Sequence, residues 1–138
     1  MKMLFVDTAG WVAMADGAES LGAPARAARD GWLADGGWLL TTDYVVAETL
    51  TVLRARLGLD AAEAWWTQIA ASQRLRWETI DPSRADKARA IFFRFRDKDF
   101  SFVDCTSFVI MREVRVADAL TLDDHFRQMG FRVLPARP

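Results

Sequence analysis

Four carboxylates lie where the sequence predicts that a strand ends or a helix begins: Asp7, Glu48, Asp104 and Asp123. The first three close the apolar segments LFVD, VVAE and SFVD, and the fourth follows the run ALTL. An acid in such a place lies at the rim of a hydrophobic core. Four acids brought together there would repel one another strongly unless a cation joined them. The hypothesis is therefore a divalent-metal site.

Other metal or nucleophile chemistry finds little support in the composition. Cys105 is the only cysteine and His125 is the only histidine, which excludes an internal disulfide, a thiolate cluster and a His-rich zinc site. The neighbouring acids would raise the pKa of Cys105 and make it a poor nucleophile. His125 is expected in a short helical turn, and no chemistry is assigned to it.

Three of the acids also have a structural explanation. Asp7, in DTAG, has the residue type and the place of a helix N-cap. Asp104 stands three residues after Ser101, which is the spacing of a capping box, and a carboxylate in the first helical turn stays ionised. Asp124 directly follows Asp123, so it remains the alternative fourth acid.

The order of predicted elements places the acids on a layered fold. Strands are expected at residues 3–6, 38–41, 75–80, 117–122 and 131–134, and helices at 8–16, 24–34, 42–57, 61–71, 82–96, 101–114 and from 124. Short apolar strands that alternate with helices indicate a mainly parallel sheet covered on both faces. Ligands bind at the carboxyl ends of strands in such sheets, so all four acids are compatible with one crevice.

The bulk composition limits the class of protein. The 138 residues suit one domain spanning 1–138, and 51% of them are hydrophobic. A net charge of −1 excludes a uniformly basic nucleic-acid binder but not a local basic patch. No stretch approaches the ~18 apolar residues of a membrane span, and Asp7 interrupts the opening segment too early for a secretory signal. We expect a soluble cytoplasmic protein.

Four segments resemble PIN-domain ribonucleases of the VapC toxin type: MLFVDTAGW, TTDYVVAETLT, SFVDCTSF and ALTLDDHFRQMGF. They cover nearly the whole chain in order, with 41, 56 and 19 residues between successive acids. The resemblance implies a three-layer α/β/α fold with a central, mainly parallel sheet. It also implies a Mg²⁺ or Mn²⁺ site, endonucleolytic cleavage of RNA phosphodiester bonds with a metal-activated water, a homodimer, and a cognate antitoxin.

Carried over by position, the acidic quartet is Asp7, Glu48, Asp104 and Asp123. We expect Asp7 and Asp104 to be the direct metal ligands, and Glu48 and Asp123 to act through water or on a second metal. The supporting polar residues are Thr8, Thr106 and Asp124.

Partner-binding residues follow from charge and apolar surface. Arginines or lysines at the rim must attract the RNA, because an acidic pocket repels phosphate. The candidates, each of which could equally belong to a solvated helix face, are Arg94, Arg96, Lys98, Arg112 and Arg115. Trp65 and Trp66 suit the core, with some surface exposed at an interface. The candidates for an exposed surface that binds the antitoxin are Trp11, Trp65 and Trp66.

Two other functions place acids at strand ends. A Mg²⁺-dependent phosphoryl-transfer or receiver-type domain is one, but Asp7 is followed by TAG instead of a DxDxT motif, and no lysine follows Leu122 where a receiver needs one. A non-catalytic PIN-like binding module is the other. It would not need all four acids.

Overall fold

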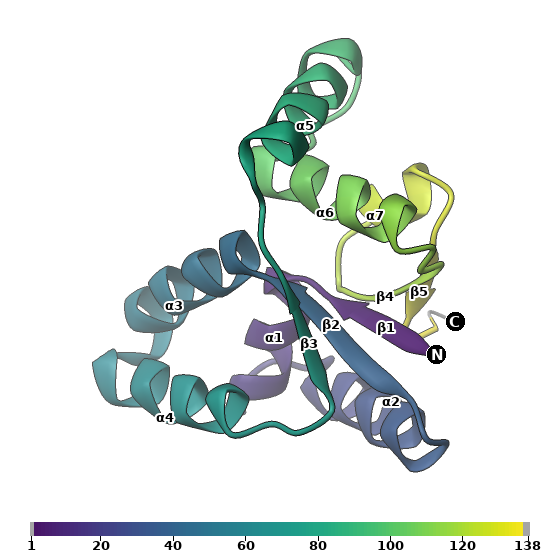
Figure 1. The fold of residues 1–138 in the computed structure, drawn as a ribbon. Coiled ribbons are helices and arrows are strands. Elements are labelled where there is room, and N and C mark those ends of the chain that lie inside the picture. Colours follow the sequence, from purple (N-terminus) through teal and green to yellow (C-terminus); the bar gives the residue numbers. More distant parts are fainter. Residues whose placement is uncertain (1, 137–138) are drawn as a thin grey trace.

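The computed structural model describes residues 2–136 and contains an open sheet between two layers of helices (Figure 1). In chain order its elements are β1 (Met3–Val6), α1 (Thr8–Ala15), α2 (Gly22–Ala34), β2 (Trp38–Thr42), α3 (Asp43–Leu57), α4 (Leu59–Ala70), β3 (Leu75–Glu78), α5 (Pro82–Arg94), α6 (Phe102–Glu113), β4 (Asp118–Leu120), α7 (His125–Gln128) and β5 (Arg132–Leu134).

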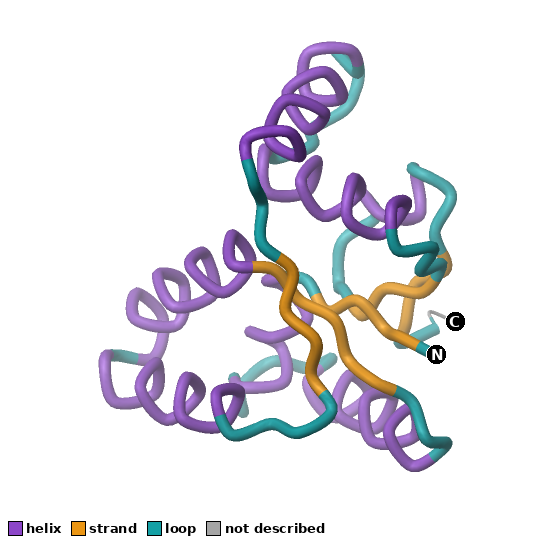
Figure 2. Tube along the Cα trace, viewed as in Figure 1, coloured by secondary structure: helices purple, strands orange, loops and turns teal. Residues whose placement is uncertain are grey.

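The sheet is parallel throughout and has the strand order β3-β2-β1-β4-β5. Following the chain, β2 and β3 are added on one side of β1, and β4 and β5 are then added on its other side. Right-handed crossovers therefore place α1–α4 on one face and α5–α7 on the other, as Figures 1 and 2 show. The predicted α/β/α class and parallel sheet are confirmed. The strand order reverses between β1 and β4, which is where such sheets bind ligands.

The centre of the sheet is buried on both faces. Every residue of β1 is buried, as a strand covered by helices on both sides requires. On the α6–α7 face, Phe5 lies 6.0 Å from Phe126, and Phe126 lies 5.0 Å from Phe108, measured between ring centroids. All three rings are fully buried. This aromatic cluster fixes α6, which carries Asp104, and α7, which follows Asp123, against β1.

Local sequence signals set where α3, the helix that carries Glu48, begins and ends. Thr42 caps α3 by accepting a hydrogen bond from the Val45 N–H at 3.1 Å. Gly58 ends the helix with a φ of +96°, a conformation that residues with a Cβ rarely adopt. The predicted limits at 42–57 therefore agree with the structure. None of the described helices combines the length and apolarity that a bilayer span needs.

The expectation that three tryptophans are exposed was wrong for two of them. Trp11 and Trp65 are only 5% and 6% exposed and pack edge to face at 5.7 Å. Trp65 shares the buried face of α4 with Ile69, one turn away, whereas Trp66 points outward and is 43% exposed. Only Trp66 therefore remains available to a partner.

Candidate active site

One pocket of about 430 Å³ is lined by all four predicted acids: Asp7, Glu48, Asp104 and Asp123. Asp7 follows β1, Asp123 follows β4, and Glu48 and Asp104 come from α3 and α6. The pocket therefore lies at the carboxyl edge of the sheet, beside the switch point between β1 and β4. The structure brings the quartet together from four segments that are distant in the sequence.

Asp7 is a buried carboxylate held on both oxygens. It caps α1 by accepting a hydrogen bond from the Gly10 N–H at 2.8 Å, and its other oxygen accepts one from the Thr121 hydroxyl at 2.8 Å. A Cβ at Gly10 would lie 2.3 Å from the carbonyl oxygen of Leu120, so glycine lets α1 approach β4 this closely. Burial, followed by the charge of Asp123, raises the pKa of Asp7 well above its usual range.

Asp104 is fixed by the predicted capping box. The Ser101 N–H donates to its carboxylate at 3.0 Å, and the Asp104 N–H donates to the Ser101 hydroxyl oxygen at 3.0 Å. Burial raises the pKa of Asp104, the Ser101 bond opposes that change, and the charge of Asp123 adds to it. Capping and a place in the pocket therefore coexist in this residue.

The two adjacent acids separate in space. Asp123 lines the pocket, and one of its carboxylate oxygens accepts a hydrogen bond from the His125 backbone N–H at 3.1 Å. The Asp123 N–H in turn donates to the Thr121 hydroxyl oxygen at 3.3 Å. Asp124 points away from the pocket toward solvent, where it pairs with Arg127 at 2.6 Å. The geometry therefore favours Asp123 as the fourth acid.

Of the two predicted threonines, only Thr8 lines the pocket. Its hydroxyl oxygen is buried and has no hydrogen-bond partner within the described part of the chain. Thr106 instead points into the fold, where its hydroxyl donates to the Val103 carbonyl at 2.6 Å. Ser107 lines the pocket in its place, because it lies three residues after Asp104 and shares that face of α6.

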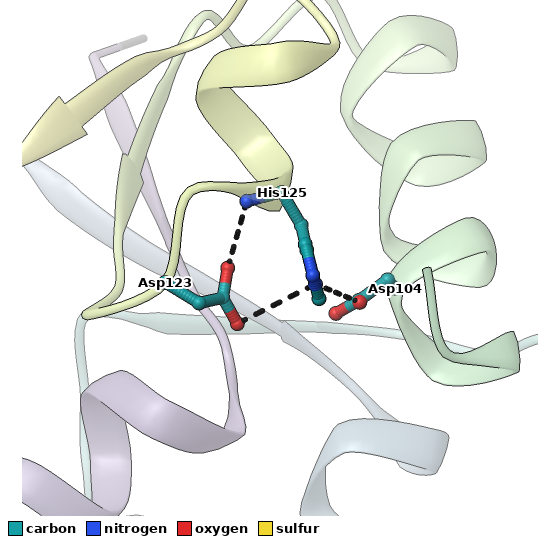
Figure 3. Close-up of side chains that lie close together, drawn as sticks. All are labelled: Asp104, Asp123 and His125. Carbon is teal, nitrogen blue, oxygen red and sulfur yellow. Dashed lines mark hydrogen bonds and ion pairs between the residues drawn. The ribbon is translucent and has the colours of Figure 1, made fainter. Parts of the chain in front are cut away.

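His125 reaches both acids of the α6–α7 side and was not predicted to take part (Figure 3). Its Nδ1 lies within hydrogen-bond distance of an Asp104 oxygen, at 2.7 Å, and 3.9 Å from the nearer Asp123 oxygen. Only the position of His125, two residues after Asp123, could have indicated this role from the sequence. The distance to Asp104 depends on how α6 and α7 pack.

Arg56 was weighed only as an ion-pair partner of Glu48 and not as an RNA-binding residue, although it is the only arginine or lysine among the described residues that lines the pocket. It continues a stripe on α3 with Glu48 and Val52, and all three line the pocket. That i, i+4, i+8 spacing was visible in the sequence and could have identified it.

The five basic residues that were predicted to bind RNA lie outside the pocket. All are exposed; they are Arg94, Arg96, Lys98, Arg112 and Arg115. Arg94 packs on the ring of Phe95, and Lys98 pairs with Asp97 at 3.4 Å. Their role in RNA binding stays a prediction.

The expectation for Cys105 is confirmed. The thiol is buried, and burial together with the charge of Asp104 raises its pKa to about 11. It is therefore a protonated core residue at neutral pH and makes a poor nucleophile.

The donor set of the pocket fits a divalent cation. Ligand atoms of Asp104, Asp123 and His125 all lie within 4.8 Å of one another. The charge of Asp123 also opposes ionisation of the buried Asp7, so the site holds more negative charge than its own hydrogen bonds balance. The unpartnered Thr8 hydroxyl is a further oxygen in the same pocket. A bound cation would offset this repulsion, and carboxylate oxygens are the ligands that hard cations prefer.

Comparison with known proteins agrees with this architecture. The family model described as PIN domain matches residues 4–132. The chain is 31% identical over 129 residues to the 23S rRNA-specific endonuclease VapC20 of Mycobacterium tuberculosis, in strains CDC 1551 and H37Rv, covering 94% of this chain and 95% of that protein.

Solved structures give the same result. The crystal structure of M. tuberculosis VapC20, described as a sarcin-ricin loop cleaving toxin, matches with a TM-score of 0.84 and 30% identity over 98% of this chain and 99% of that one. VapBC2 from Rickettsia felis, bound to a promoter DNA fragment, matches at 0.71 with 9% identity, and FitAcB from Neisseria gonorrhoeae at 0.66 with 15%. Each match covers 95% of this chain and 96% of the solved chain. Because the identities are low, these two structures support the fold alone. The chain belongs to the PIN domain family, as a protein of the VapC type.

Proposed function

We propose that residues 1–138 form one domain that acts as a metal-dependent endoribonuclease, the toxin of a VapBC-type toxin–antitoxin pair. The observation that carries this proposal is the single pocket lined by Asp7, Glu48, Asp104 and Asp123. The relative that is 31% identical over 94% of this chain is named as a 23S rRNA-specific endonuclease. Ribosomal RNA is therefore the substrate class to test first. A homodimer, a cytoplasmic location and neutralisation by a cognate antitoxin belong to the same proposal.

We assign a divalent cation, Mg²⁺ or Mn²⁺, to Asp7, Asp104 and Asp123, with Glu48 acting through water or on a second ion. When bound, such a cation lowers the pKa of a water molecule and stabilises negative charge on phosphate oxygens. It also allows the buried Asp7 to ionise beside Asp123, against the desolvation that opposes its charge.

The chain contributes a preorganised set of carboxylates. Asp7 cannot rotate without losing its bonds to Gly10 and Thr121, and Asp104 is held by the Ser101 N–H. Asp104 also lies in the first turn of α6, where the helix dipole favours a negative charge. Glu48 is half-buried in the pocket wall, where its carboxylate can accept a hydrogen bond from an attacking water molecule. These fixed positions reduce the reorganisation that phosphodiester cleavage requires.

Cleavage of RNA should depend on added metal. We expect purified protein to cut ribosomal RNA at a small number of sites with Mn²⁺ or Mg²⁺, to lose that cleavage with excess EDTA, and to regain it when the cation is restored. Sequencing of the RNA 5′ ends gives the positions of the cuts. Absence of cleavage under every metal condition would favour the non-catalytic binding module. Cleavage that persists in EDTA would contradict the metal assignment.

Arg56 is proposed to guide the RNA phosphates toward this acidic pocket. The change Arg56→Gln should raise KM several-fold with little change in kcat, since it removes an attraction that acts before chemistry. It should also reduce the slope of log affinity against log salt by roughly 0.7, the value for one phosphate contact on single-stranded nucleic acid. Cleavage rates and filter binding at several salt concentrations measure both effects.

Arg54→Gln is the matched control, because Arg54 is exposed on the same last turn of α3 but does not line the pocket. Equal effects of the two changes would replace the specific role of Arg56 with a general effect of charge.

A further inference from the structure

His125 is joined to two carboxylates of the pocket through different atoms. Its ring Nδ1 lies 2.7 Å from an Asp104 oxygen and 3.9 Å from an Asp123 oxygen. Its backbone N–H separately donates to the other Asp123 oxygen at 3.1 Å. Figure 3 shows the imidazole between the two acids, with Asp104 reached from α6 and Asp123 from the loop before α7. One residue therefore lies against both carboxylates.

The orientation of the imidazole is set by packing around it. The ring meets Phe100 edge to face at 5.6 Å, and Phe100 is itself buried against Phe108 at 5.1 Å. The next residue, Phe126, is fully buried and anchors α7 in the core. The side chain of His125 is about one quarter exposed, so its nitrogen faces the pocket from a supported position.

The three ligand atoms have the spacing of a coordination shell. They all lie within 4.8 Å of one another. In an octahedral shell with bonds of about 2.1 Å, adjacent ligands are about 3 Å apart and opposite ligands about 4.2 Å. The observed separations can therefore be reached with small shifts of the side chains.

We propose that His125 Nδ1 is a nitrogen ligand, beside Asp104 and Asp123, in the cation site of this protein, and that the site therefore selects Mn²⁺ and related transition ions over Mg²⁺. Imidazole suits first-row transition metals, whereas Mg²⁺ prefers oxygen ligands and retains its waters. This inference rests on the cation site of the proposed nuclease but not on its RNA substrate.

The same contact has two forms that differ by the place of one proton. Without a cation, the tautomer with its hydrogen on Nδ1 would donate that hydrogen to Asp104, 2.7 Å away. When a cation binds, the neutral ring presents the Nδ1 lone pair and carries its hydrogen on Nε2. The exchange moves one hydrogen between the two ring nitrogens, and the contact with Phe100 keeps the orientation of the ring.

Electron spin-echo spectroscopy of the Mn²⁺-loaded protein tests this ligand directly. The wild-type protein should show the ¹⁴N coupling of a directly bound imidazole, and His125→Asn should lose it. An asparagine amide nitrogen can still donate a hydrogen bond to Asp104 but has no lone pair for a metal. We expect the Mn²⁺ affinity of His125→Asn to fall at least about tenfold, since removing even a hydrogen-bond partner of a metal ligand costs that much. The Mg²⁺ affinity should fall by less. Calorimetry measures both affinities.

Two variants make the result unambiguous. Asp104→Asn should weaken Mn²⁺ binding, which locates the ion in this pocket, and Asp30→Asn, on the exposed part of α2, should not change it. The proposal is overturned if wild-type protein binds Mn²⁺ through Asp104 without ¹⁴N coupling, because His125 is then only a hydrogen-bond partner. It is also overturned if Mn²⁺ binding is unaffected by both Asp104→Asn and His125→Asn. Neither outcome depends on RNA cleavage, so failure of the nuclease function would be seen separately.

Discussion

Replacing Asp7 by asparagine is expected to lower metal-dependent RNA cleavage at least about a hundredfold while leaving the fold intact. The change removes the charge of a carboxylate that is held on both oxygens inside the acidic pocket. Loss of about 3 kcal/mol of transition-state stabilisation already corresponds to that factor. Asparagine can still accept the Gly10 hydrogen bond that caps α1, so the helix should not fray. Cleavage of ribosomal RNA under saturating Mn²⁺, with circular dichroism of the same samples, measures both effects.

The same substitution should stabilise the metal-free protein at neutral pH. Without a cation, Asp7 must either ionise while buried beside Asp123 or hold a proton that the unfolded chain would release. Asparagine avoids both costs. We expect a gain of about 1 kcal/mol, which for a domain of this size raises Tm by roughly 3–5 °C. Thermal unfolding in EDTA measures this gain.

The pH dependence of this gain has a definite sign. Burial raises the folded-state pKa of Asp7 above the unfolded value near 3.8, so the folded state binds more protons between the two values. The contribution of Asp7 to the stability of the metal-free wild type should therefore be fully present below the unfolded pKa and be lost as pH rises through the folded pKa. The advantage of Asp7→Asn should appear over that interval and vanish in acid. The pKa of Asp104 shifts in the same direction, and its charge is one of the causes that raise the pKa of Asp7, so the comparison includes the loss of that repulsion.

Asp30→Asn is the control for charge, since Asp30 is exposed and pairs only with the adjacent Arg29 in the described structure. It should alter neither cleavage nor the pH profile measurably. Two results would contradict the assignment of Asp7. One is cleavage that survives Asp7→Asn. The other is a lower Tm for the variant at neutral pH in EDTA.

The sequence predicted the parts of the site that depend on local signals. The Thr42 cap and Gly58 define the limits of α3, and the Ser101–Asp104 capping box defines the start of α6. Asp104 lies in the first turn of α6 as predicted, whereas Glu48, also predicted in a first turn, lies in the second turn of α3. The apolar run 3–6 likewise predicted that Asp7 follows a buried strand. In a parallel sheet these positions share one edge, which is why the quartet could be assembled without coordinates.

The errors concern orientation and contacts between distant segments. Thr106 and Ser107 are neighbours of similar chemistry, and a shift of one residue on α6 decides which of them reaches the pocket. The contact between His125 and Asp104 joins residues 21 apart and depends on Phe100, Phe108 and Phe126 packing α7 against α6. No local pattern contains that information.

The adjacent acids after β4, Asp123 and Asp124, give the second prediction of a large effect on RNA cleavage. Asp123→Asn is expected to reduce cleavage at least about a hundredfold, because its carboxylate lines the pocket and repels the charge on Asp7 until a cation joins them. Asp124→Asn should stay within about twofold of wild type, since Asp124 faces solvent and its pair with Arg127 is about half exposed. Both variants remove one negative charge from adjacent positions, so the net effect on RNA attraction is the same.

The comparison also separates chemistry from folding. An asparagine at 123 retains an oxygen that can accept the His125 N–H, which keeps the start of α7 in place. Asp123→Asn should therefore keep its Tm in EDTA or gain stability, because one carboxylate that repels Asp7 has been removed. The reverse order of activities, with Asp124→Asn inactive and Asp123→Asn active, would mean that the loop after β4 rearranges when RNA or metal binds. If both variants kept the activity of the wild type, neither Asp123 nor Asp124 would be needed, and Asp7, Glu48 and Asp104 would be left to hold the cation.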